Sequence, residues 1–306
     1  MKIERSSHRV SLLAILLAGC ATASQAEVEA PRPGQEESVE SGPVSPPVTD
    51  PGTDARQQDG NDVAPAFDQT HARWTKVLKA NVKGPLFDYA AVAKDPSELK
   101  AYLAELESVT PEALAGWTRE QRYAYWINAY NAYTIQLIVD NLPLKSIRDL
   151  SGSFGLSSVF DKAWIPLEPH HPKGKKKKLS LNDIEHEILR PRFEDARVHA
   201  AVNCASWSCP PLLGEAFVAA RLEKQLDAQM RAFVADRDRN VFDRGKKVAR
   251  ISKIFDWFRS DFDRDAGSVR AYLLKYASEE DAAFLRDAKL RHVDYDWKLN
   301  AVEKDS

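Results

Sequence analysis

The chain has 306 residues, 43% of them hydrophobic and 29% charged, and a formal net charge of −2. A charge so close to zero argues against a nucleic-acid-binding protein, which carries a basic patch or stripe. Roughly 240 residues remain after the N-terminal segments described next, enough for one good-sized core in a single domain.

Residues 1–19 are predicted to be an export signal. A basic start precedes an apolar run at Val10–Ala18, which is shorter than the roughly 20 residues that span a bilayer. The sequence LAGC at 17–20 resembles the lipobox of bacterial lipoproteins, which implies cleavage before Cys20 and lipidation of its sulfur. The non-acidic Ala21 that follows is typical of outer-membrane sorting. The expected partner is therefore a lipid bilayer, and the expected location is the periplasmic face of the outer membrane. An ordinary secretory signal with a chance cysteine is the alternative.

Residues 20–64 are predicted to form a disordered tether. Positions 26–64 hold nine acidic side chains against two arginines, six of the seventeen prolines and no aromatic residue. Such a stretch buries too little apolar surface to offset the entropy of ordering it. It would hold the folded domain, residues 65–306, clear of the lipid surface.

Helices dominate the first half of this domain. Asp95-Pro96 and Thr110-Pro111 are typical helix starts, and Thr118 with Gln121 forms a capping box before a long apolar helix.

Within that long helix, Asn128 and Asn131 are three residues apart and share a face. Each amide would cost about 1–3 kcal/mol if it were buried without a partner. We expect the two side chains either to tie the helix to a neighbouring loop or to orient a catalytic group.

The second half mixes helices and strands. Ser180 and Asp183 cap a helix that reads LNDIEHEILR, and the basic tract 173–178 is predicted to be an exposed hairpin tip. Strands are predicted at 160–167, 248–251 and 292–299, and helices at 222–233 and 255–262. The predicted class is therefore α+β, with a small antiparallel or mixed sheet flanked by helices.

The stretch 198–211, VHAAVNCASWSCPP, holds both cysteines of the predicted domain. Alternating apolar residues from Val198 to Val202 predict a short strand. Cys204 would then begin a loop, and Pro210 would begin a helix because it has no N–H to leave unpaired. A cysteine at such a junction can be a nucleophile, half of a disulfide or a plain buried side chain.

Four segments covering roughly residues 87–300 together resemble the bacterial branch of the domain-of-unknown-function 547 family. They are YWINAYNA (125–132), LSLNDIEHEILRP (179–191), VHAAVNCASWSCPP (198–211) and YDWKLN (295–300). The resemblance implies a distant relation to papain-like cysteine hydrolases. The plant-type motif of that family has cysteine at the position of Cys204 and serine at that of Cys209, which implies a role for Cys204 that does not need Cys209.

Cys204 is accordingly the predicted nucleophile and His186 its base, since a neighbouring imidazolium stabilises a thiolate. His199 would point to the opposite face of a regular strand from Cys204. A structural, hydrogen-bonded side chain is the alternative for His186. The substrate would be a peptide, amide or thioester of the cell envelope. Further candidates are Glu185, Asn128 and Asn131 as the orienting group, and the N–H groups of Ala205 and Ser206 as oxyanion donors.

Two other classes of protein stay open. A disulfide between Cys204 and Cys209 suits an oxidising compartment, and it would stabilise a binding or structural lipoprotein. If that bridge is reducible, the chain would be a thiol–disulfide redox protein. The two cysteines lack the C-x₂-C spacing of zinc sites, so neither a metal nor another cofactor is predicted.

Overall fold

The computed structural model describes residues 66–152, 158–174 and 177–303, all of which belong to one compact unit. The predicted export signal, Cys20 and the tether lie outside the described residues, as do Lys175 and Lys176 of the basic tract. Among the described helices, none has both the length and the hydrophobicity needed to span a bilayer.

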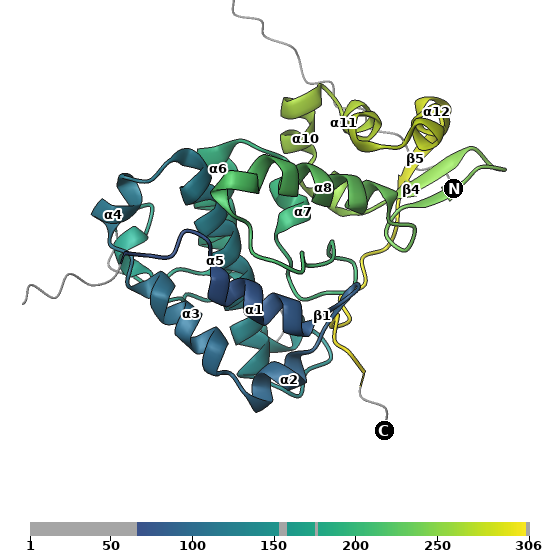
Figure 1. Cartoon of the computed structure of the whole chain (residues 1–306). Coiled ribbons are helices and arrows are strands. Elements are labelled where there is room, and N and C mark those ends of the chain that lie inside the picture. Colours follow the sequence, from purple (N-terminus) through teal and green to yellow (C-terminus); the bar gives the residue numbers. More distant parts are fainter. Residues whose placement is uncertain (1–65, 153–157, 175–176, 304–306) are drawn as a thin grey trace, which may run out of the picture. The chain divides into compact units, whose positions relative to one another are not determined.

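Helices make up most of the described chain (Figure 1). Short 3₁₀ turns and one π-helix lie between the α-helices. The α-helices are α1 (Ala72–Asn81), α2 (Tyr89–Lys94), α3 (Ser97–Glu107), α4 (Pro111–Ala115), α5 (Arg119–Val139), α6 (Arg190–Phe193), α7 (Val198–Ala201), α8 (Leu222–Ala235), α9 (Ile254–Trp257), α10 (Arg259–Ala266), α11 (Val269–Tyr276) and α12 (Glu279–Asp287). The 3₁₀ turns are η1 (Ile147–Leu150), η3 (Val159–Asp161), η4 (Glu168–His170) and η6 (Ala219–Arg221), and η5 (Asp183–Leu189) is a π-helix.

Two small sheets complete the described structure and confirm the predicted α+β class. The first pairs β1 (Val82–Lys83) with β2 (Leu86–Phe87) antiparallel. In the second, β4 (Val248–Ile251) pairs antiparallel with β3 (Val241–Asp243) and parallel with β5 (Lys289–His292). Helices α9 to α12 form the crossover between the two parallel strands.

The predicted helix caps at Thr118 and Ser180 are confirmed. Thr118 Oγ1 accepts from the Gln121 N–H at 3.2 Å, and Gln121 Oε1 accepts from the Thr118 N–H at 2.9 Å. Asp183 Oδ2 accepts from the Ser180 N–H at 2.8 Å, and Ser180 Oγ accepts from the Asp183 N–H at 3.0 Å. These reciprocal bonds satisfy N–H groups that helix starts leave unpaired.

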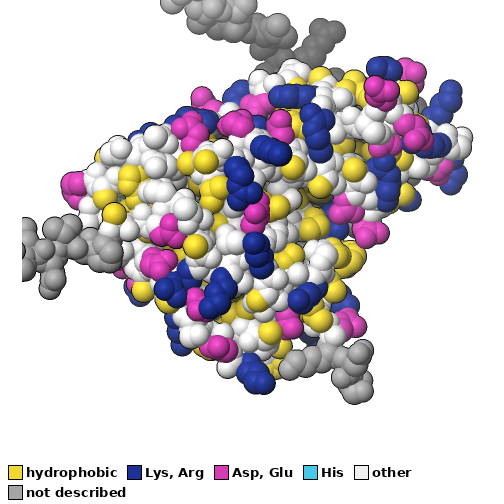
Figure 2. Space-filling model, viewed as in Figure 1, with side chains coloured by type: hydrophobic (Ala, Val, Ile, Leu, Met, Phe, Trp, Pro, Cys, Tyr) yellow, Lys and Arg dark blue, Asp and Glu magenta, His cyan; other side chains and the backbone are white. Residues whose placement is uncertain are grey.

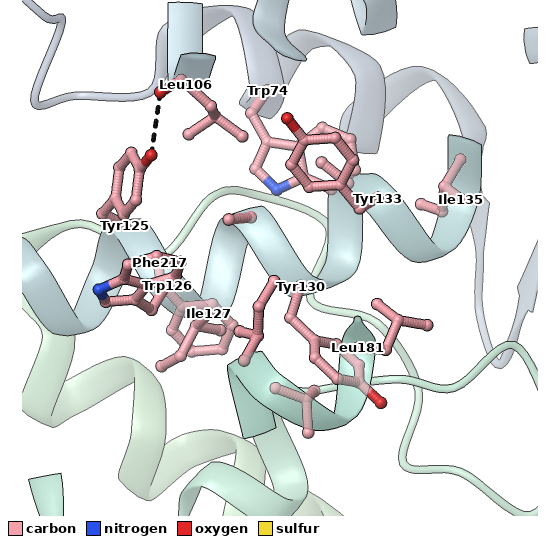
Figure 3. Close-up of a cluster of buried hydrophobic side chains, with 14 of the residues drawn as sticks. Trp74, Leu106, Tyr125, Trp126, Ile127, Tyr130, Tyr133, Ile135, Leu181 and Phe217 are labelled. Carbon is pink, nitrogen blue, oxygen red and sulfur yellow. Dashed lines mark hydrogen bonds between the residues drawn. The ribbon is translucent and has the colours of Figure 1, made fainter. Parts of the chain in front are cut away.

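Helix α5 is the centre of the larger hydrophobic core. Every residue from Tyr123 to Ile138 is buried, so neighbours enclose the helix on all sides. Trp74 of α1 and Leu181 belong to the same core, and the Tyr125 hydroxyl donates to the Leu106 carbonyl at 2.9 Å (Figure 3).

A second core lies among α8 to α12 and the three-stranded sheet. Met230 and Phe233 of α8 pack there with Phe255 and Phe262. Helix α7 contributes to both cores, because Val198 and Ala201 belong to the first and Ala200 to the second. The segment that follows α7 therefore starts at the boundary between the two cores. On the face shown in Figure 2, acidic and basic side chains are interspersed, in keeping with a net charge near zero.

The strand predicted at Val198–Val202 is wrong, because these residues form α7 and its C-cap. The Val202 N–H donates to the Val198 carbonyl at 3.0 Å, and His199 is as buried as its apolar neighbours. Alternation of residue types therefore did not reflect alternation of burial. Pro210 begins no helix either. Its carbonyl accepts from Asn203 Nδ2 at 2.8 Å, and the chain stays irregular up to η6.

Two further strand predictions are wrong in position. Residues 160–167 hold a 3₁₀ turn and one isolated bridge, from Ile165 to Leu179. The final strand ends at His292, where the predicted strand 292–299 was to begin. The strand at 248–251 and the helix at 222–233 are confirmed. The helix predicted at 255–262 is present as α9 and α10, which are separated at Phe258.

Candidate active site

A cavity of about 150 Å³ lies beside the chain segment that follows α7. Its walls come from α5, η5, α7, α9 and the C-terminal residues 295–297, with aromatic side chains forming much of the lining. The fold brings both thiols and both candidate imidazoles to this one place. The cysteine, histidine and glutamate side chains that line it are Cys204, Cys209, His186, His199 and Glu185.

The two thiols share the same hydroxyl neighbours. Cys204 Sγ lies 3.2 Å from Ser206 Oγ and 3.3 Å from the Tyr295 hydroxyl, and Cys209 Sγ lies 3.4 Å and 3.1 Å from the same two atoms. The Cys204 N–H donates to Cys209 Sγ at 3.1 Å. Both cysteines are free thiols, and Cys204 is half-buried whereas Cys209 is buried. The Cys204–Cys209 disulfide stays a prediction.

These contacts separate the pKa values of the two thiols. Burial opposes the ionisation of Cys209, but hydrogen bonds from the Cys204 thiol and from the Ser206 and Tyr295 hydroxyls outweigh it and lower the Cys209 pKa to about 6. The hydrogen bond with Cys209, together with burial, raises the pKa of Cys204 well above its ordinary value. These contacts favour loss of one proton from the pair while the second proton is retained between the two sulfurs.

Between the thiols, Ala205 adopts a left-handed conformation with φ of 62°. For a residue other than glycine this costs about 1–2 kcal/mol. The Asn203 side chain holds the turn, because its Oδ1 accepts from the Ala205 N–H at 2.7 Å. That N–H, predicted as an oxyanion donor, is therefore occupied, whereas the Ser206 hydroxyl faces the two sulfurs.

The C-terminal segment runs alongside this turn and supplies Tyr295. The Trp207 N–H donates to the Lys298 carbonyl at 2.7 Å, and the Asn300 N–H donates to the Ala205 carbonyl at 3.1 Å. Sequence reasoning did not assign Tyr295 to the site, although the motif YDWKLN, which begins with it, had been singled out.

His199 lines the cavity, contrary to the expectation that it would point away from Cys204. That expectation depended on strand geometry, which α7 replaces. The His199 Nε2 lies 2.8 Å from Asp261 Oδ2, and the ring stacks on Phe258 with centroids 3.8 Å apart. Burial lowers the pKa of His199, and the hydrogen bond to Asp261 partly offsets this effect. Nothing in the sequence around Asp261 pointed to this role.

His186 lines the same cavity but is engaged by an arginine. Its Nδ1 lies 2.8 Å from Arg190 Nη1, and since a guanidinium only donates, Nδ1 must accept. Burial and the nearby Arg190 charge both lower the pKa of His186. Among the described hydrogen bonds, none joins His186 to Cys204, and the pairing of these two side chains stays a prediction.

Glu185 and Asp261 are two buried carboxyl groups with opposite pKa shifts. Burial raises the pKa of Glu185 to about 7, against a hydrogen bond with Tyr130 that lowers it. Burial also opposes the ionisation of Asp261, but hydrogen bonds from His199 and Arg190 hold its pKa well below the usual range. Within the described residues, no group of three or more histidine, cysteine or acidic side chains could hold a metal ion.

Asn128 and Asn131 tie α5 to the loops that carry the site. Asn128 Oδ1 accepts from the Phe217 N–H at 3.0 Å, and its Nδ2 donates to the Phe217 carbonyl at 2.8 Å. Asn131 Oδ1 accepts from the Asn203 N–H at 2.9 Å, and its Nδ2 donates to the Ala201 carbonyl at 2.9 Å. Both amides thus bond to backbone, and Asn131 positions the residue directly before Cys204.

Residues 114–234 match the sequence family described as "Protein of unknown function, DUF547". The chain carries a DUF547 domain. The matched residues include three of the four motifs that carry the resemblance, together with both thiols, both imidazoles and Glu185. Asp261 and Tyr295 lie outside the matched residues, although Tyr295 lines the same cavity and Asp261 bonds to His199. No curated protein and no solved structure gave a significant match.

Proposed function

We propose that this DUF547 domain is a cysteine-dependent acyl transferase or hydrolase, acting on a peptide, amide or thioester of the cell envelope. The observation that carries the proposal is that two interacting thiols and a carboxylate-bound histidine line one cavity. Cysteine, histidine and a polar orienting group are the chemical groups of papain-like hydrolases. A distant relation to those enzymes is part of the proposal.

Cys204 is the proposed nucleophile, because it is the more exposed of the two thiols and has the Cys209 thiolate beside it. As Cys204 Sγ bonds to the acyl carbon, its proton passes to Cys209 and the carbonyl electron pair moves onto oxygen. The neighbouring thiolate thus serves as the first proton acceptor.

Glu185 and His199 are proposed to move the remaining protons. Glu185, whose pKa is about 7, gives its proton to the leaving group as the tetrahedral adduct collapses to a thioester. When Nε2 of His199 donates to Asp261, its Nδ1 is free of a proton and can take one from the water that attacks this thioester. His199 then returns that proton to the departing Cys204 sulfur, and Cys209 returns its own to Glu185.

The hydroxyls of Ser206 and Tyr295 are the proposed donors to the oxyanion. Both lie within hydrogen-bonding distance of the Cys204 sulfur. Burial raises the pKa of Tyr295 well above its ordinary value, so this hydroxyl stays protonated and able to donate.

The test uses small acyl donors, p-nitrophenyl acetate and S-phenyl thioacetate, with the full-length protein. Intact-mass analysis and peptide mapping should find one acetyl group, on Cys204. Cys204→Ser should abolish both that adduct and turnover. The matched variant Cys209→Ser should still acetylate at position 204, but only at higher pH. Turnover that persists in Cys204→Ser would contradict the proposal.

A thiol–disulfide redox function is the second candidate, favoured by the contact between the Cys204 N–H and Cys209 Sγ. One thiolate of the pair would attack a substrate disulfide, releasing a substrate thiolate. The second cysteine would then displace the other substrate sulfur, so that two electrons pass to the substrate and a Cys204–Cys209 disulfide forms. Equilibration with reduced and oxidised glutathione, followed by counting of alkylated thiols, tests this candidate. A reversible midpoint supports it, and a bridge that resists reduction would favour a stabilised binding or structural lipoprotein.

Lipidation of Cys20 is proposed from the sequence LAGC alone. It would anchor the domain at the periplasmic face of the outer membrane and keep its substrates within reach of the lipid surface. Cell fractionation should find the wild type with membranes and Cys20→Ser in the soluble fraction. Equal fractionation of the two would contradict the anchor.

A further inference from the structure

A second cavity, of about 540 Å³, lies between α4, the start of α5, η4 and α6. Figure 1 shows α4 and α6 at the same end of α5. The cavity shares no lining residue with the thiol cavity, and nothing in the proposed chemistry uses it. Its volume falls within the range of small-molecule sites.

The charged side chains that line this cavity are all basic. They are Arg119, Arg122 and Arg192, and none of the described lining residues is acidic. The hydrogen bonds of the first two go to backbone carbonyls: Arg119 Nη2 to Phe193 at 2.6 Å, and Arg122 Nη1 to Trp117 at 3.0 Å. A carbonyl orients a guanidinium without neutralising it, so the positive charges stay uncompensated within the cavity.

Stacking holds Arg119 in place, and partial burial restricts Arg122. The Arg119 guanidinium lies over the rings of Tyr123 and Phe193, at 5.7 Å and 5.6 Å from their centroids. Arg122 is half-buried, whereas Arg119 and Arg192 are exposed. Guanidiniums oriented in this way lose less freedom on binding than freely rotating side chains.

Two adjacent histidines add hydrogen-bonding groups to the wall. His171 Nδ1 accepts from the Lys173 N–H at 3.2 Å, which leaves the proton of the neutral ring on Nε2 as a donor. His170 Nε2 bonds to the Val109 carbonyl at 2.8 Å and so must carry its proton there. Burial lowers the pKa of His170; the Glu112 charge opposes this effect and the Arg192 charge adds to it. Of these two charged residues, only Arg192 lines the cavity.

We propose that this cavity binds a small ligand through a phosphoryl group. A phosphate monoester carries about −1.5 to −2 charges at pH 7 and three acceptor oxygens, so it suits several guanidiniums better than a single carboxylate does. Guanidiniums also bind phosphate oxygens in pairs of parallel hydrogen bonds. The phosphoryl group belongs either to a soluble ester or to a phospholipid headgroup.

Isothermal titration of the full-length protein with glycerol 3-phosphate and with pyrophosphate tests the proposal, with potassium acetate at equal ionic strength as the control anion. Saturable binding of either phosphorylated probe, and none of acetate, is the expected result. Co-sedimentation with phosphatidylglycerol and with phosphatidylcholine vesicles separates the two sources. Preference for phosphatidylglycerol without binding of the soluble probes assigns the site to a headgroup.

The double variant Arg119→Gln/Arg192→Gln removes two exposed guanidiniums and should bind about tenfold more weakly or worse. Arg291→Gln, at an exposed position on β5, removes the same kind of charge elsewhere and should bind like the wild type. Cys204→Ser should also bind normally, which separates this site from the thiol chemistry. Absence of saturable binding to every phosphorylated probe would overturn the proposal, as would an equal loss in Arg291→Gln.

Discussion

His199 Nε2 and Asp261 Oδ2 lie 2.8 Å apart and join α7 to α10 across the candidate active site. Arg190 binds the same carboxylate through Nε at 2.7 Å and Nη2 at 3.1 Å. One carboxylate therefore compensates the Arg190 charge and orients the His199 ring. The position of the imidazole depends on a salt bridge between residues far apart in the sequence.

The first prediction concerns this shared carboxylate. Asp261→Asn leaves the half-buried Arg190 without its counter-charge, and we expect a loss of roughly 2–4 kcal/mol in the free energy of unfolding. Urea denaturation at neutral pH measures the loss. Asp287→Asn, at the exposed end of α12, is the control and should change stability by less than about 0.5 kcal/mol. Equal stability of the two variants would show that the Arg190–Asp261 contact contributes nothing.

The second prediction is a pH dependence caused by Glu185. Its pKa is about 7 in the folded protein, against an ordinary value of 4.5, so folding favours the neutral acid. The resulting stabilisation is complete below pH 4.5 and is lost as the pH rises through 7. Glu185→Gln keeps a neutral side chain at every pH. The free energy of unfolding of Glu185→Gln should therefore equal that of the wild type near pH 4 and exceed it by about 3 kcal/mol near pH 9.

Urea midpoints of wild type and variant at the two pH values give this difference directly, because other titrating groups cancel. Glu187→Gln, two residues along and only half-buried, should show the same urea midpoints relative to the wild type at both pH values. A Glu185→Gln difference that does not change with pH would mean that the folded-state pKa of Glu185 is ordinary.

The third prediction concerns the low pKa of the thiol pair. The Tyr295 hydroxyl is one of the groups that stabilise the Cys209 thiolate, so Tyr295→Phe should raise the pH at which the pair ionises above about 6. The rate of iodoacetamide alkylation as a function of pH reports that value. Tyr272→Phe removes a hydroxyl in the second core and should leave the profile unchanged. Coincident profiles for wild type and Tyr295→Phe would exclude this hydroxyl as a source of the shift.

The fourth prediction concerns Asn131, whose side chain bonds to the backbone of Ala201 and Asn203. Asn131→Ala leaves the buried N–H of Asn203 and the buried carbonyl of Ala201 without partners. We therefore expect a loss of roughly 2–4 kcal/mol in the free energy of unfolding, measured by urea denaturation. Asn141→Ala is the matched control. Its single bond to the Leu137 carbonyl lies at the partly buried end of α5, and its loss should cost about 1 kcal/mol or less. An equal loss in the free energy of unfolding for both variants would contradict an anchoring role for Asn131.

Local signals in the sequence were enough to predict the helices that begin at a cap. Thr118 and Gln121 determine the start of α5 through their own hydrogen bonds, which depend on nothing outside the first turn. Ser180 and Asp183 do the same before η5. The tying role of Asn131 was also predictable, because a buried amide needs partners whatever surrounds it.

The site itself depends on long-range contacts that local patterns do not contain. Apolar residues at every second position from Val198 to Val202 favoured a strand with His199 facing solvent. Instead His199 is buried, because Asp261 supplies its polar partner. Likewise the carbonyl of Pro210 bonds to the Asn203 side chain instead of the next helical turn. These two of the misassigned elements lie at the candidate site, where tertiary hydrogen bonds replace secondary-structure bonds.

The most direct test of the account compares two histidine variants in the acyl-transfer assay with S-phenyl thioacetate. His199→Gln can still bond to Asp261 but loses the imidazole, so turnover should fall by about 10²–10⁴-fold while acetylation of Cys204 persists. His186→Gln should retain most of the turnover, since Arg190 already occupies the Nδ1 of that ring. The opposite ranking, with His186→Gln inactive and His199→Gln active, would contradict the assignment of His199 as the acid–base group.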